Sequence, residues 1–341
     1  MSPAVFLLVA VAVSCVAAAH LLAGAAWPRR SPAVAIALWQ ALGLSWGVAT
    51  VGALAGFGAS GTRERAGSGL TSVAAAATRT ARLMLGAGGA ARRWDIMTTL
   101  RMVSLIAGIL LLALLCWILI AAVAAVLRAR HRQRTLLGLL AHDDPKVPGA
   151  LVVDHPAAAA YCLPGLRSAI VISAGALDLL DQAELAAVLA HERAHLRARH
   201  DLVLLPFTAL LRAFRWSAIA RDANSEVALL VEMMADDRAR RRRPARELAT
   251  ALLRVGASGG GLAPTGALAI AGGPGGSSPR ANTAGPARDN PSGQTMDGEL
   301  AARVTRLLRP PPGLPVSASI LVGAVAAGLV AAPALSMLLP L

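Results

Sequence analysis

The chain has 341 residues, of which 56% are hydrophobic and only 15% are charged. This composition excludes an ordinary water-soluble protein, in which about a quarter of the residues are charged, and the abundance of apolar residues excludes an intrinsically disordered chain. The formal net charge of +14 suits either an anionic membrane surface or nucleic acid, and the high hydropathy favours the membrane.

The first 127 residues are predicted to form a membrane region with three spanning helices, because a helix needs about 20 apolar residues to cross a bilayer. The predicted spans cover about residues 3–27, 33–57 and 102–127. The first of them lacks the basic start of a signal peptide and is therefore interpreted as a true span.

Arginine placement predicts the orientation of the spans, since cytoplasmic loops are enriched in Arg and Lys. The turn after the first span contains Arg29 and Arg30, and residues 128–134 after the third span contain four more Arg. Both segments are therefore expected in the cytoplasm, although the loop at 58–101 also carries seven Arg. The protein is predicted to be a multi-pass cell-membrane protein whose polar domain faces the cytoplasm.

The remainder of the chain divides by composition into three segments. Residues 128–256 are mixed in composition and are expected to fold as a polar domain. Residues 257–298 are rich in Gly, Pro and Ser and are predicted to be a flexible linker. Residues 299–341 are expected to form a short basic helix followed by a fourth span at about 316–341.

The polar domain contains the sequence HERAH at 191–195. His191 and His195 are four residues apart, so on a helix they project from the same face. Two imidazoles at this spacing can bind one zinc ion, and Glu192 between them is placed to act as a general base. The competing interpretation is a solvated helix face that happens to bear two histidines.

A helix over this motif is supported by local signals. Asp181 is a candidate N-cap, and Glu184 three residues later completes a capping box. The apolar residues that follow recur at helical spacing.

A catalytic zinc requires a third protein ligand, and the sequence EMMAD at 232–236 offers one. Glu232 is far enough downstream of His195 to lie on a second, antiparallel helix. Asp236 would lie on the same face of that helix and can accept a hydrogen bond from a ligand histidine. Glu226 is an alternative third ligand, and Glu232 and Asp236 could instead be solvated acids among the arginines at 238–243.

These motifs resemble those of the membrane-bound zinc metallopeptidases of the BlaR/MecR type, including their sensorless actinobacterial relatives. The HtpX-type and CAAX-processing peptidases share the pattern. Residues 152–254 look like the catalytic core of that family. The segments at 160–165 and 169–172 resemble its strand pair, which makes Cys162 a strand residue rather than a nucleophile.

The resemblance implies that His191, His195 and Glu232 bind zinc, that Glu192 is catalytic and that Asp236 orients a ligand histidine. It does not identify a group that stabilises the transition state. The candidates for that role are Tyr161, His200 and Arg303. The adjacent pair His200 and Asp201 is otherwise interpreted as solvation of a helix end.

The predicted protein is thus a multi-span helical membrane protein with an inserted α+β, zincin-like domain of the gluzincin type. Its predicted activity is zinc-dependent hydrolysis of internal peptide bonds by an activated water, in regulatory proteolysis or membrane-protein turnover. Its expected partners are one Zn²⁺ per chain, the lipid bilayer and a protein or peptide substrate, either a cytoplasmic transcriptional repressor or a membrane protein. Nucleic acid is not expected, because only 3% of residues are aromatic. The alternative is a non-catalytic membrane signalling protein whose metal domain binds a cytoplasmic regulator.

Overall fold

The computed structural model describes most of the chain as two compact units. One unit comprises Met1–Leu119 with Leu314–Leu341, and the other comprises Ile120–Gly313. Most of the predicted linker at 257–298 and most of the Arg-containing loop at 58–101 lie outside the described residues, while residues 291–298 of the predicted linker belong to a helix. The described residues are 3–60, 78, 96–145, 147–165, 168–258, 261–262 and 291–338.

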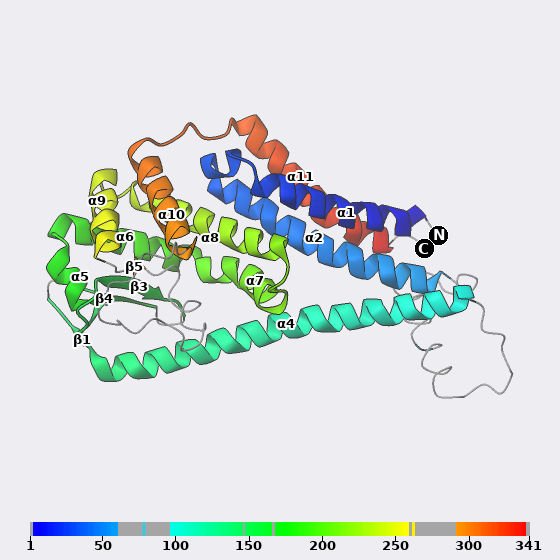
Figure 1. Ribbon diagram of the computed structural model, residues 1–341, viewed down its shortest axis with the longest axis horizontal. Coiled ribbons are helices and arrows are strands. Elements are labelled where there is room, and N and C mark those ends of the chain that lie inside the picture. The colour runs from blue at the N-terminus through cyan, green and yellow to red at the C-terminus, as the bar shows by residue number, and fades with distance from the viewer. Residues whose placement is uncertain are drawn as a thin grey trace. The chain divides into compact units, whose positions relative to one another are not determined.

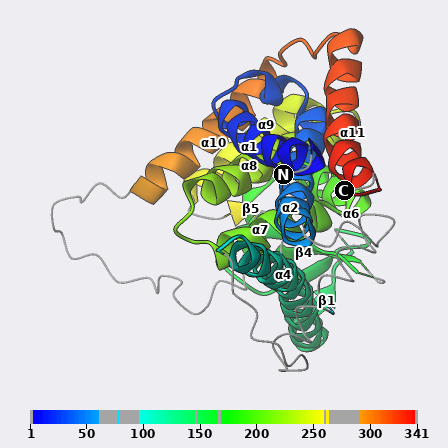
Figure 2. The same ribbon diagram turned by 90° about the vertical axis from the view of Figure 1, so that its right-hand side faces the viewer.

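The first unit contains helices α1 (Pro3–Ala23), α2 (Pro32–Ala59) and α11 (Val316–Leu338), which lie side by side in both views (Figures 1 and 2). The short 3-10 helix η1 (Trp27–Arg30) joins α1 to α2. Ser45 on α2 donates a hydrogen bond of 2.7 Å to the Leu329 carbonyl on α11, so a polar contact accompanies the apolar packing.

Helix α4 (Ile96–Leu140) has 45 residues and is longer than the predicted third span. The predicted span at 102–127 lies inside it, and the Arg-rich segment that follows continues the same helix instead of leaving the membrane region as a loop. The two compact units divide within this helix. No Gly or Pro at residues 128–134 interrupts the helical pattern, which explains why it continues.

Four described helices are long and apolar enough to cross a bilayer. This confirms the predicted combination of four apolar helices of spanning length with an α+β region. Many of their large apolar side chains are exposed, as expected for surfaces that contact lipid tails. The four helical segments are Pro3–Ala23, Pro32–Ala59, Ile96–Leu140 and Val316–Ser336.

The second unit is built on a five-stranded mixed sheet with the order β1-β2-β4-β3-β5. The central strand β4 pairs antiparallel with β3 and parallel with β2, while the two edge strands are short. β5 pairs with β3 only at Ala159 and Ala160. The strands are β1 (Ala141–Asp143), β2 (Leu151–Val153), β3 (Ala159–Leu163), β4 (Ala169–Ser173) and β5 (Gly261–Leu262).

Six helices accompany the sheet in this unit. Helix α6 packs on β3 and β4 and also on α8 and α9, so it lies at the centre of the domain. Its residues Ala187 and Val188 are fully buried in the same apolar core as Ile172 of β4. The helices are α5 (Ala174–Leu179), α6 (Gln182–Ala198), α7 (His200–Ala213), α8 (Ala218–Ala239), α9 (Ala245–Ala257) and α10 (Pro291–Leu308).

Helix α10 packs on α8 and α9 and lies within the compact unit Ile120–Gly313. The domain expected from composition ended at residue 256, and the basic helix at 299–309 was grouped with the fourth span. In the structure this helix covers one side of α8 (Figure 1).

Candidate metal centre

The helix that carries the HERAH sequence begins at the predicted capping box. The Glu184 backbone N–H donates to Asp181 Oδ1 at 2.8 Å, and the Asp181 N–H donates to Glu184 Oε2 at 3.0 Å. Arg254 of α9 also donates to the buried Glu184 carboxylate at 2.9 Å. The start of α6 is therefore fixed both by its own residues and by a neighbouring helix.

His191 and His195 face the same point in the interior. They are one helical turn apart on α6, both are at least 95% buried, and their Nε2 atoms are 3.0 Å apart. Since neither ring is exposed, the interpretation of this motif as a solvated helix face is wrong.

Glu232 of α8 completes a group of three potential metal ligands. Its Oε2 lies 3.4 Å from His191 Nε2, and its Oε1 lies 3.6 Å from His195 Nε2. The ligand atoms of a tetrahedral zinc ion, bound at 2.0–2.1 Å, are roughly 3.3–3.5 Å from one another. The three side chains therefore already form a triangle of the right size, and Glu226 is not a member of this group.

The charges around this triangle also fit a divalent cation. Glu192, Glu232 and Asp236 are three buried carboxylates, and Arg303 is the buried guanidinium beside them. With neutral imidazoles, these groups leave two negative charges in the interior, which is costly unless a cation compensates them. Imidazole nitrogens with a carboxylate oxygen are a donor set that Zn²⁺ prefers.

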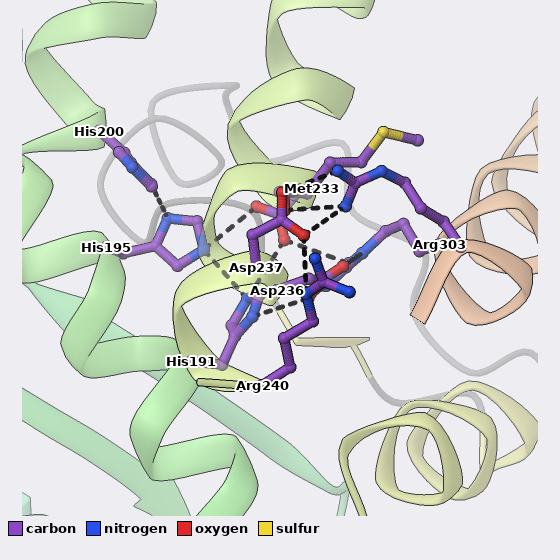
Figure 3. A network of polar contacts seen from close by, with 10 residues as sticks. His191, His195, His200, Met233, Asp236, Asp237, Arg240 and Arg303 are labelled. Carbon is purple, nitrogen blue, oxygen red and sulfur yellow. Dashed lines mark hydrogen bonds and ion pairs between the residues drawn. The ribbon is translucent and has the colours of Figure 1, made fainter. Parts of the chain in front are cut away.

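Asp236 and Arg303 surround the outer side of the triangle (Figure 3). Asp236 Oδ1 lies 2.9 Å from His191 Nδ1. Arg303 of α10 donates two hydrogen bonds of 2.9 Å to the Asp236 carboxylate, and its Nη1 lies 3.1 Å from Glu232 Oε2. The Arg303 guanidinium thus contacts both Asp236 and Glu232 of α8.

A second arginine of α10 also pairs with an acid of α8. Arg306 lies one turn after Arg303 and donates to both Asp237 oxygens at 2.7 and 2.8 Å. Asp237 also contacts Arg240 on its own helix at 3.2 Å. The α8–α10 contact is therefore a row of charge pairs, and the metal triangle lies at one end of it (Figure 3).

Burial and charge act in opposite directions on the ionisable groups of the site. Burial raises the pKa of Glu232, but His195 and Arg303 outweigh it and hold that pKa well below its usual value. Burial also raises the pKa of Asp236, but the charge of Arg303 is the main effect that opposes it, and the pKa of Asp236 is lowered overall. For His191, burial lowers the pKa, but Asp236 and Glu232 overcome it and raise the pKa to about 10. The acids are thus ionised, and in the metal-free site His191 carries a proton.

Glu192 differs from the other two acids, because the charges around it do not outweigh the effect of its burial. Burial raises its pKa, and the neighbouring His191 and His195 only partly oppose this effect. The Cys162 thiol of β3 lies beside its carboxylate, and burial together with this acid raises the pKa of Cys162. Cys162 is therefore a protonated strand residue, as the resemblance implied.

The pair at the start of α7 has a different role from the one predicted. His200 is fully buried, and its Nδ1 lies 2.9 Å from His195 Nδ1, on the side away from the metal triangle (Figure 3). Asp201 is also buried and forms an ion pair with Arg130. The interpretation of these residues as helix-end solvation is wrong. The left-handed conformation of Arg199, with φ 47°, makes the tight turn that brings α7 back against α6.

The candidates for transition-state stabilisation do not form one group. Arg303 is occupied by Glu232 and Asp236, and His200 lies behind His195. Tyr161 is half-buried on β3, and burial raises the pKa of its hydroxyl. In the described part of the chain, no side-chain hydrogen bond or ion pair joins Tyr161 to the metal triangle.

Comparison with known proteins agrees with this geometry. Residues 126–235 match the model of Peptidase family M48. This region is similar to the peptidases of that family. Searches of the curated proteins and of the solved structures found no match.

The M48 match and the His191–His195–Glu232 triangle together confirm the predicted enzyme class, a zinc metallopeptidase and hence a hydrolase. The match does not distinguish the BlaR/MecR type within this wider group. It ends just before Asp236, so Arg303 lies outside the matched region. The importance of Arg303 rests on its contacts in the structure.

Proposed function

We propose that the chain is an integral membrane zinc endopeptidase in which His191, His195 and Glu232 hold the metal. The supporting observation is the buried triangle of three ligand atoms, with separations of 3.0, 3.4 and 3.6 Å. When bound, zinc supplies a Lewis acid that lowers the pKa of a water molecule to about 7.

Glu192 is the proposed general base. Its carboxylate accepts a proton from the attacking water and later donates that proton to the amine of the leaving peptide. Its raised pKa makes it a better proton acceptor than an ordinary carboxylate. Asp236 is the proposed orienting residue for His191, and Arg303 is a positioning residue that holds Asp236 and Glu232.

The test is zinc content and cleavage of a casein substrate by the detergent-purified chain. We expect one zinc per wild-type chain, loss of zinc in His195→Ala and Glu232→Ala, and retention of zinc with loss of cleavage in Glu192→Gln. Glu226→Gln is the matched control for Glu232 and should change neither quantity. Cleavage that persists in Glu192→Gln would refute its role as base. Wild-type protein that binds zinc without cleaving any substrate would favour the non-catalytic signalling function.

The proposed substrate-binding element is the open side of β3. Beyond Ala160 this strand has no ladder partner on that side among the described strands, so an extended peptide can add to it. Proline at Tyr161 or Leu163 should prevent cleavage without removing zinc. Proline variants that keep their melting temperature and still cleave would exclude this mode of binding.

The proposed orientation places the catalytic domain in the cytoplasm, on the basis of Arg29, Arg30 and the Arg-rich segment 128–134. Trp216, between α7 and α8, is 81% exposed and is a suitable labelling position. A cysteine placed there should react with a membrane-impermeant maleimide only after the cells are permeabilised, with the unsubstituted chain as the blank. Labelling in intact cells would reverse the orientation.

The proposed physiological substrate is either a cytoplasmic transcriptional repressor or a membrane protein, and the proposed subtype is the BlaR/MecR type. This proposal rests on the resemblance of the two motifs. Proteins that accumulate on the zinc-loaded Glu192→Gln variant, but not on Glu232→Ala, are the candidate substrates. A trapped repressor would support the subtype, whereas trapped membrane proteins would support a role in turnover.

A further inference from the structure

A cavity of about 320 Å³ lies beside the metal-carrying helix and plays no part in the proposed hydrolysis. Its floor is a stripe of three alanines of α6, Ala190, Ala194 and Ala198, spaced so that they share one face of the helix. Two of these alanines directly precede His191 and His195 in the sequence. The cavity therefore adjoins the helix that carries the proposed metal ligands.

The walls of this cavity carry four arginines. They are Arg197 of α6 together with Arg238, Arg241 and Arg242 at the end of α8. Arginines near a helix C-terminus are common, because they interact favourably with the helix dipole. That preference accounts for their position along each helix, but not for their convergence on one concave surface from two different helices.

The four guanidinium groups lack acidic partners, unlike most nearby arginines. Arg240 and Arg306 pair with Asp237, and Arg303 pairs with Asp236. Within the described residues, no carboxylate forms an ion pair with any of the four cavity arginines. Four uncompensated positive charges facing one cavity create a strong local field for an anion.

We propose that this cavity binds a phosphate group. Guanidinium groups recognise phosphate through pairs of charge-assisted hydrogen bonds, and four of them can surround one tetrahedral anion. The phosphate can come from free inorganic phosphate or from the headgroup of an anionic lipid, because the chain has four helices of membrane-spanning length. Both sources present the same oxygen atoms to the arginines.

Arg238 connects this cavity to the metal centre through a chain of hydrogen bonds. Its Nη1 lies 2.9 Å from His200 Nε2, and His200 Nδ1 lies 2.9 Å from His195 Nδ1. Arginine can only donate, so His200 must accept at Nε2 and carry its proton on Nδ1. That proton is then directed at His195 Nδ1, and a neutral His195 keeps its own proton on Nε2, the atom that faces Glu232.

Metal binding through His195 Nε2 requires the opposite proton arrangement, a step that rests on the proposed function. His195 must then donate from Nδ1 to His200, and His200 must carry its proton on Nε2, where it would face the Arg238 guanidinium. A phosphate that draws Arg238 into the cavity removes this conflict between two donors. Phosphate and zinc are therefore expected to strengthen each other's binding, by the same factor in both directions.

The first experiment measures phosphate binding to the zinc-free, detergent-purified full chain by calorimetry at constant ionic strength. The Arg241→Gln/Arg242→Gln variant removes two cavity charges. Arg243→Gln/Arg246→Gln removes two exposed arginines that do not line the cavity, and is the matched control. We expect the first variant to bind phosphate at least about tenfold more weakly than the wild type and the control to stay within about twofold. Equal weakening in both variants, or no saturable binding by the wild type, would overturn the proposal.

The second experiment measures zinc affinity at buffered free zinc, with and without phosphate. Phosphate should raise the zinc affinity of the wild type, whereas Arg238→Met, which cannot donate to His200, should bind zinc tightly with no response to phosphate. An equal response in wild type and Arg238→Met would overturn the connection through His200. Absence of zinc binding under all conditions would refute the proposed function, while the calorimetry on zinc-free protein would still decide the anion site.

The two sources of phosphate are distinguished in nanodiscs. Discs of phosphatidylcholine alone are compared with discs that contain phosphatidylglycerol as well. A lipid headgroup ligand should raise the zinc affinity in the anionic discs, in the wild type and the Arg243→Gln/Arg246→Gln control but not in Arg241→Gln/Arg242→Gln. A free phosphate ligand should act equally in both kinds of disc. If neither source raises zinc affinity, the cavity is not coupled to the metal centre.

Discussion

Replacing Arg303 by alanine should strongly destabilise the peptidase domain. The substitution removes a guanidinium that makes three contacts of 2.9–3.1 Å and leaves Glu232 and Asp236 ionised in the interior without that partner. Breaking a buried ion pair from one side costs about 3–5 kcal/mol. For a domain of this size, each kcal/mol lowers the melting temperature by about 2–4 °C. We therefore expect the zinc-free domain to melt about 6–20 °C lower.

Two variants and the pH dependence test the cause of this loss. Arg309→Ala removes an exposed arginine from the same end of the chain and should change the melting temperature by little. Arg303→Lys keeps the charge but loses the paired geometry, so it should be intermediate. Because Arg303 lowers the pKa values of Glu232 and Asp236, its contribution is fully present at neutral pH. It should begin to fall once the pH drops below the ordinary pKa of a carboxyl, about 4, and disappear as the pH passes through the lowered pKa values of the two acids. A loss under about 1 kcal/mol at pH 7, or one that persists unchanged in acid, would refute the charge argument.

Three further predictions address the chemistry and the fold. Because the pKa of His191 is raised to about 10 in the metal-free site, zinc must displace a proton. Apparent zinc affinity should rise about tenfold from pH 7 to pH 8, and calorimetry in two buffers should detect the released proton; an affinity independent of pH would contradict the protonation of His191. Glu192→Gln should lower kcat for peptide cleavage by at least about a hundredfold with zinc still bound, as measured with a fluorogenic peptide. In Gly175→Ala the new Cβ would overlap the Pro156 carbonyl, so we expect a loss of about 1–3 kcal/mol, and an unchanged thermal melt would show that the loop before β3 can move.

The features predicted correctly from the sequence are those encoded by short-range patterns. The apolar stretches gave the four helices of spanning length, and the spacing within HERAH gave two histidines on one helix face. The capping box at Asp181 and Glu184 is local by definition, and it forms as predicted. Glu232 was identified because an acid on a second helix has the right chemistry and enough chain to return to His195.

The features that were missed depend on contacts between distant segments. Arg303 was named only as a candidate for stabilising the transition state, and its pairing with Asp236, 67 residues away, was not foreseen because no periodicity in the sequence indicates such a contact. His200 was misinterpreted because a polar residue after a helix is usually solvated, whereas the left-handed turn at Arg199 directs it inward. Helix α4 extends beyond the predicted span at 102–127, because a run of arginines ends an apolar stretch without ending a helix.

The late position of Arg303 in the chain has a consequence for biosynthesis. A ribosome that has made residues 1–257 has produced both histidines, Glu192, Glu232 and Asp236, but not the Arg303 guanidinium that compensates Glu232 and Asp236. That guanidinium is made only just before α11, the last helix of spanning length, which begins at Val316. During translation the peptidase domain is therefore expected to remain incomplete until synthesis has passed Arg303. This order would delay proteolytic competence until well after the metal ligands have been made.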